Sequence, residues 1–172
     1  MATTFTQIGS AQVAGVGGAA TLTFTAIPST YTDLVLKTSL RGTGSLIYDA
    51  VKLTFNGTSS GYSTRYIQGN GSSATSGTSG SSAYIELIDE GATATSSTFS
   101  NSELYIPNYA GSAYKSISSD AVTETNATTI YMRLSAGLWS NSAAITSITL
   151  TPDNSAAWAQ YSTAYLYGVS NA

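Results

Sequence analysis

The side chains that could do chemistry in this chain are hydroxyls and carboxylates, because the sequence contains neither His nor Cys. The lack of these residues excludes a Ser-His-Asp triad, a Cys-His pair, disulfides and zinc–thiolate sites. A Ser-Lys pair stays formally open, but no matching motif surrounds any lysine: Lys37, Lys52 and Lys115. The many serines are therefore expected in turns and on the surface.

The nine acidic residues offer the next candidate chemistry. Glycoside hydrolysis needs two carboxylates facing each other across a cleft. Glu86 and Glu103 fall in expected strands, and we expect both on outward faces rather than paired. Asp89 and Glu90 are adjacent at an expected strand end, where a solvated turn is the simpler interpretation. The sequence therefore predicts no catalytic residues and no enzyme activity.

Two short segments, IDEG at 88–91 and TPDNS at 151–155, are rich in oxygen ligands. Calcium takes about six to eight oxygens, often from several acidic groups. Neither segment resembles an EF-hand loop, and we expect both to be tight turns in which Asp or Asn bonds its own backbone. The sequence thus predicts no metal ion and no cofactor.

Aromatic residues are the remaining functional candidates, with twelve Tyr and two Trp. Exposed Tyr and Trp can stack on sugar rings, and they are also favoured in protein–protein interfaces. For the two tryptophans, packing in the core or under a loop is the first interpretation, interface anchoring the second and sugar stacking the third. The candidate interface residues are Trp139, Trp158, Tyr165 and Tyr167.

Strands must position these side chains, because the recurring hydrophobic period is two. Such alternation marks a strand with one buried and one solvated face. The clearest runs are 22–27, 33–42, 51–56 and 130–134, with further strands expected near 4–9, 62–68, 83–89, 102–106, 114–122, 144–151 and 161–169. In 130–134 the alternation assigns Ile130, Met132 and Leu134 to the buried face, opposite Tyr131 and Arg133.

Many short strands without a helical stripe predict an all-β protein. We expect an antiparallel, jelly-roll-like β-sandwich of about 8–11 strands with no significant helix. An immunoglobulin-like sandwich is the competitor, but it usually has fewer strands and a Cys–Trp–Cys pattern that this chain lacks. Residues 1–172 are expected to form a single domain, with 1–20 as an extended arm or a mobile tail. The long Gly/Ser loop 69–82 is expected either to be disordered or to be ordered by a neighbouring subunit.

Charge and hydropathy argue against nucleic-acid-binding and membrane-spanning proteins. Charged residues make up 9% of the chain, and the six basic residues never cluster, so we expect no nucleic-acid partner. No signal peptide and no membrane-spanning stretch is recognisable, which predicts a soluble protein that is not exported by the general secretory route. A surface poor in charge suits a protein that is largely covered by neighbours.

Three segments carry a family resemblance: FTAIPSTYTDLVLKTSLRG at 24–42, LTFNGTSSGYSTRYIQG at 53–69, and ITSITLTP at 145–152 followed by QYSTAYLYGV at 160–169. In this order they resemble small β-sandwich virion structural proteins of tailed bacteriophages, especially marine phages and cyanophages. The resemblance implies a capsid decoration (cement) protein on the outer capsid surface, often a homotrimer, that binds and stabilises the major capsid protein shell. The alternative is a tail fibre or tail-tip adsorption module that binds a host surface glycan.

The closing segments also yield a prediction about faces. We expect Ile148, Leu150, Ala164 and Leu166 toward the core. Tyr165 and Tyr167 then fall on the opposite face, where we expect a neighbouring protein.

Overall fold

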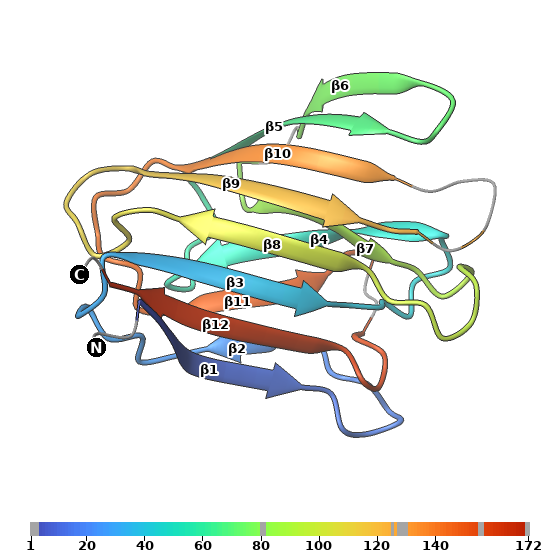
Figure 1. The fold of residues 1–172 in the computed structure, drawn as a ribbon, viewed down its shortest axis with the longest axis horizontal. Helices are drawn as coiled ribbons and strands as arrows, with labels where there is room; N and C mark the ends of the chain where they lie inside the picture. Colours follow the sequence, from blue (N-terminus) through green and yellow to red (C-terminus); the bar gives the residue numbers. More distant parts are fainter. Residues whose placement is uncertain (1–3, 80–81, 125, 127–130, 155–156, 171–172) are drawn as a thin grey trace.

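Two antiparallel β-sheets make up the fold in the computed structural model, which describes residues 4–79, 82–124, 126, 131–154 and 157–170 (Figure 1). The described residues contain no helix. The larger sheet has eight strands, in the order β1 (Phe5–Gln12), β12 (Thr163–Val169), β3 (Asp33–Ser39), β8 (Asn101–Ile106), β9 (Lys115–Val122), β10 (Met132–Trp139), β5 (Tyr62–Gly69) and β6 (Ala74–Thr78). The smaller sheet has four, in the order β2 (Leu22–Phe24), β11 (Ile148–Pro152), β4 (Tyr48–Phe55) and β7 (Ile85–Glu90).

Strand pairing gives the sandwich a jelly-roll topology. Strand β1 pairs with β12 and β3 with β8 in the large sheet, whereas β2 pairs with β11 and β4 with β7 in the small sheet. These four antiparallel pairs are thus divided equally between the two sheets, as in a jelly roll. The expected all-β sandwich is confirmed, and the described residues form twelve strands in place of 8–11.

The other four strands extend only the large sheet. Strands β5 and β6 are inserted between β4 and β7, and β9 and β10 between β8 and β11. They line up beside β8 in the order β9, β10, β5, β6, so the large sheet reaches well past the small one (Figure 1).

The Gly/Ser segment contains a strand that was not expected, and the N-terminal segment contains the strand that was expected near 4–9. Within the Gly/Ser segment 69–82, β6 pairs with β5; Thr78 is opposite Arg65 at one end of the pairing, and Ala74 is opposite Gly69 at the other. Residues 80–81 lie outside the described residues. Gly77 leaves room for the Tyr66 side chain, since a Cβ at position 77 would lie 2.5 Å from the Tyr66 hydroxyl oxygen. Within the segment 1–20, β1 forms the edge of the large sheet, and residues 1–3 are not described.

The core between the sheets follows the predicted alternation in most strands. Ile148, Leu150 and Ala164 are fully buried and Leu166 is 1% exposed, as predicted. Phe55, Tyr62 and Trp139 form an aromatic cluster in the core at the end of β10, with the Phe55 and Trp139 ring centroids 5.5 Å apart. The Tyr62 hydroxyl oxygen accepts a 2.8 Å hydrogen bond from the backbone N–H of Phe55, so this buried N–H has a partner.

Strand β10 has the opposite facing to the prediction. Met132 and Leu134 are 67% and 56% exposed, whereas Arg133 is 4% exposed; Ile130 lies outside the described residues. Side chains alternate along a strand, so Trp139 in the core forces all odd-numbered positions of β10 inward. Gly137 strengthens this constraint, because a Cβ there would approach Ile117 and Ile85 at 2.8 and 3.0 Å.

Candidate interaction face of the large sheet

The outer face of the large sheet, opposite the small sheet, presents a continuous row of side chains in cross-strand register. One side chain per strand contributes to the row: Ser10, Tyr165, Lys37, Glu103, Asp120, Leu134, Ile67 and Ser76. A neighbouring row consists of Gln7, Tyr167, Val35, Tyr105, Ser118, Ala136, Arg65 and Thr78. Residues directly opposite each other in antiparallel strands lie about 4.5–5.5 Å apart, so each row is a contiguous surface.

The β12–β3–β8 half of this face is aromatic and charged. Tyr165 is 39% exposed and Tyr167 is half-buried, so both lie on the face where they were predicted. Tyr167 and Tyr105 flank Val35, whose side chain is 3% exposed although it points outward. Lys37 forms a 2.7 Å ion pair with Glu103, whose hydrogen bond raises the pKa of the lysine.

The β10–β5 half of the face is aliphatic. Leu134 and Ile67 are directly opposite each other and are 56% and 58% exposed. Met132, two residues along β10, is 67% exposed and has Val122 of β9 opposite it. A contiguous group of exposed aliphatic side chains is a candidate binding surface. We call Ile67, Met132 and Leu134 the aliphatic patch.

The aliphatic patch borders three hollows in the sheet surface. The largest, of about 710 Å³, lies over β10, β5 and β6 and includes Arg65 and Gly77. A second, of about 490 Å³, lies between Met132, Val122 and Gly69, and a third, of about 300 Å³, lies over β8, β9 and β10. Leu134 lines all three, so it stands at the centre of a broad, shallow trough.

The two tryptophans are not on this face. Trp139 ends β10 and is 1% exposed, and Trp158 bridges Ala19 and Gly42 and is fully buried. The Trp158 indole N–H donates to the Leu150 carbonyl at 3.2 Å. Both side chains therefore pack in the core, and neither is available as an interface anchor or a sugar platform.

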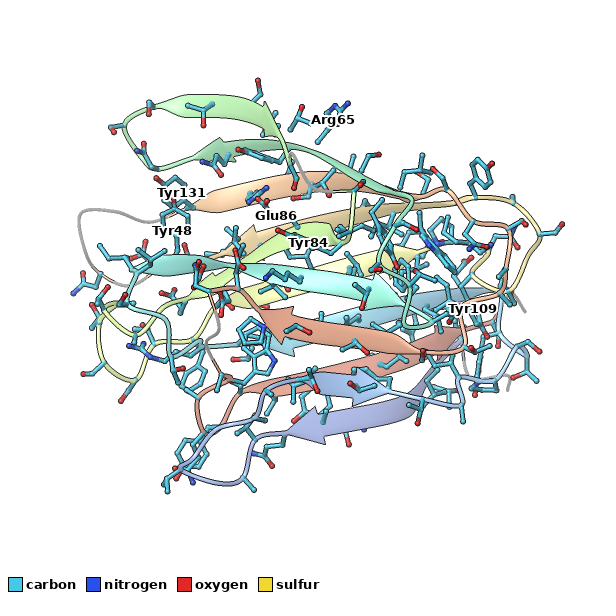
Figure 2. All side chains as sticks on the ribbon, turned by 180° about the vertical axis from the view of Figure 1, so that it is seen from behind. Tyr48, Arg65, Tyr84, Glu86, Tyr109 and Tyr131 are labelled. Atoms are coloured by element: carbon cyan, nitrogen blue, oxygen red, sulfur yellow. The ribbon has the colours of Figure 1, made fainter. Side chains whose placement is uncertain are left out.

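A second surface feature lies where the large sheet projects beyond β7. We call it the tyrosine ledge, and its tyrosines are Tyr48, Tyr66, Tyr84 and Tyr131. Arg133 reaches inward from β10, lies 3.6 Å from the Tyr66 ring centre and pairs with Glu86 at 2.9 Å. Tyr48 and Tyr131 pack together with ring centroids 4.4 Å apart, and Figure 2 shows them at one end of the ledge, with Glu86 and Tyr84 farther along it. The hydrogen bond with Tyr131 raises the pKa of Tyr48.

The carboxylates considered for catalysis do not form a pair. Glu86 is on β7 of the small sheet and pairs with Arg133 of the large sheet, whereas Glu103 is on the outer face of the large sheet, where it pairs with Lys37. Asp89 and Glu90 are both fully buried, so the expected solvated turn is wrong. The burial arises because β7 continues through both residues, with Asp89 opposite Asp49 and Glu90 opposite Tyr48.

The fold and these surfaces define an all-β jelly-roll sandwich whose large sheet leaves one broad face open among the described residues. No protein-family model, curated protein or solved structure matches the chain. No helix in the described part of the chain is long and apolar enough to cross a membrane.

Proposed function

We propose that the protein is a non-enzymatic bacteriophage virion structural protein, a capsid decoration subunit that binds the major capsid protein through the outer face of its large sheet. The observation that carries this proposal is the aliphatic patch at the centre of the trough. The segment resemblance described above supports the virion assignment and a homotrimeric assembly.

The energetics of the face suit a protein that fits against a flat neighbour. Fully burying an aliphatic side chain contributes about 1.5–3 kcal/mol. The three side chains of the patch retain 56–67% of their exposure, so covering each contributes about 1 kcal/mol or slightly more. Contacts of this size become strong when many copies bind a repeating shell.

The binding test compares two exposed leucines of similar accessibility. Leu134 is 56% exposed in the patch, and Leu46 is 50% exposed in a loop away from this face. Particles of the encoding phage, stripped of this protein, are incubated with wild-type, Leu134→Glu or Leu46→Glu protein. We expect Leu134→Glu to weaken binding at least tenfold, because it removes apolar contact and buries a charge, and Leu46→Glu to bind as wild type. Equal binding by all three proteins would refute the role of the face.

Copy number locates the protein on the particle. Mass spectrometry of purified virions is expected to give hundreds of copies for a decoration subunit. A small number of copies would favour the tail, and absence from the virion would refute both positions.

The tyrosine ledge favours a second candidate function, a tail fibre or tail-tip module that binds a host surface glycan. Its half-buried tyrosines and the Lys52 ammonium, 5.5 Å from the Tyr84 ring centre, resemble the mixture of flat rings and polar groups that holds sugars. In this case Tyr84→Ala and Tyr131→Ala lower binding to purified host polysaccharide, whereas Leu134→Glu does not. Unchanged polysaccharide binding by the tyrosine variants would eliminate this candidate.

A further inference from the structure

Two aspartates face each other inside the sandwich. Asp49 of β4 and Asp89 of β7 are directly opposite in the strand register, at 4% and 0% exposure. Like charges at directly opposite strand positions destabilise a sheet, and an unpaired buried carboxylate is costly. The small sheet therefore holds a pair of groups that opposes folding unless something neutralises it.

The protein itself supplies little neutralisation. Asp49 Oδ1 accepts hydrogen bonds from the Ala50 N–H at 2.8 Å and from Asn154 Nδ2 at 2.9 Å. Asp49 Oδ2 and both Asp89 carboxylate oxygens have no hydrogen-bond donor in good geometry among the described residues. The backbone N–H groups of Asp89 and Gly42 lie near the Asp89 carboxylate and offset only a small part of the rise in its pKa. Buried carboxylate oxygens are normally satisfied, so these three atoms call for a ligand.

The basic side chains are engaged elsewhere. All six are described, and none forms an ion pair with Asp49 or Asp89. Lys37, Lys52 and Arg133 pair with other carboxylates, whereas the rest donate to backbone carbonyls: Arg41, Arg65 and Lys115. Burial, then the charges of Asp49 and Glu90, raise the pKa of Asp89 well above its usual range. The pair thus needs either a proton or an external cation.

Two polar backbone and side-chain groups lie beside the pair. Asp89 lies opposite Asp49 in the strand register, and the Asn154 side-chain amide lies beside Asp49, to which its Nδ2 donates. The Gly42 backbone also comes close, since a Cβ at that position would lie 3.0 Å from Asp89 Oδ2. In the described chain no three His, Cys, Asp or Glu residues gather at one point, so two carboxylates are the charged ligands available.

We propose that Asp49 and Asp89 bind one calcium ion, which joins β4 to β7. Calcium binds oxygen ligands in irregular geometry and accepts backbone carbonyls, side-chain amides and water beside carboxylates. Magnesium demands a near-ideal octahedron, and zinc prefers the nitrogen and sulfur ligands that this chain lacks. The ion relieves the repulsion between the aspartates and satisfies their three free oxygens. This site is independent of the proposed virion function, because it lies in the core rather than on the outer face.

The test uses the full chain, freed of metal with a chelator and dialysed against calcium at neutral pH. Elemental analysis is expected to find about one calcium per wild-type chain. Thermal unfolding at calcium concentrations about 100-fold above Kd is expected to show a Tm rise of about 5 °C or more. Asp89→Asn and Asp49→Asn are expected to lose both effects, whereas Asp120→Asn, which alters an exposed carboxylate on β9, keeps both.

Each result decides the proposal. An amide at position 89 removes the repulsion without changing the side-chain shape, so Asp89→Asn should fold, and Asp49→Asn provides the same test if it does not. No calcium uptake by the wild-type chain would overturn the proposal. Uptake that survives in both aspartate variants would place the ion elsewhere and would also overturn it.

Discussion

Glu90 should make the protein less stable as the pH rises from acidic to neutral. Its side chain is fully buried, and neither carboxylate oxygen has a hydrogen-bond donor among the described residues. Burial raises the pKa of Glu90 from 4.5 to about 7, although the nearby Arg41 charge opposes the rise. A carboxyl whose folded-state pKa is raised stabilises the fold only while it is protonated. Its contribution is therefore complete below about pH 4.5 and is lost as the pH approaches 7.

The size of the effect follows from this pKa. The rise from 4.5 to about 7 corresponds to at most about 3 kcal/mol of unfolding free energy. Local relaxation around an ionised buried carboxylate lowers the cost of its charge, so we expect about half of that value. The neutral variant Glu90→Gln should then exceed the wild type by about 1.5 kcal/mol at pH 7.5 and match it near pH 4.5.

Urea denaturation across this pH range measures the effect, with a chelator present so that calcium binding at Asp89 does not contribute. Asp89 titrates in the same direction, so the informative quantity is the difference between the wild type and Glu90→Gln. Glu103→Gln is the control, because Glu103 is exposed and paired with Lys37. Parallel stability curves for the wild type and Glu90→Gln between pH 4.5 and 7.5 would refute the reasoning about Glu90.

Two core substitutions test the packing below β10. Trp139→Ala should lower the unfolding free energy by about 3–5 kcal/mol, because it leaves a cavity beside Phe55 and Tyr62. Urea denaturation measures this loss, and a loss below about 1 kcal/mol would contradict the burial of the indole. Gly137→Ala should lower the unfolding free energy by about 1–3 kcal/mol in the same assay, because the new Cβ would approach Ile117 at 2.8 Å. An unchanged unfolding free energy would mean that the two sheets are farther apart at this position.

Much of the fold could be predicted from alternation alone. The inward residues of β11 and β12 were assigned correctly, because each strand carries apolar side chains at every second position and has no competing signal. Strand β6 was missed, because ATSGT has no apolar alternation and forms a strand by backbone pairing with β5. Propensity patterns report buried faces, and this hairpin has little buried face to report.

The candidate site was predictable only in part. Tyr165 and Tyr167 were placed on the correct face because their strand alternates regularly. The aliphatic patch was not found, because Met132 and Leu134 look like core residues until Trp139 fixes the facing of β10. The Asp49–Asp89 pair was missed for a different reason: forty residues separate the two positions, and only the register of β4 against β7 brings them together.

The exposure of Leu134 has a local cause, since an inward Arg133 stacks on Tyr66 and pairs with Glu86. That cause does not extend to Ile67, which is on a different strand with its own facing, set by the buried Tyr62 and Thr64. Two strands nevertheless place exposed aliphatic side chains directly opposite each other, beside neighbours as polar as Asp120 and Ser76. A sequence selected only to fold has no reason to keep both positions apolar, because polar residues there would cost the core nothing. The coincidence therefore favours a face that is covered in the working assembly, and it makes Leu134 the first residue to test.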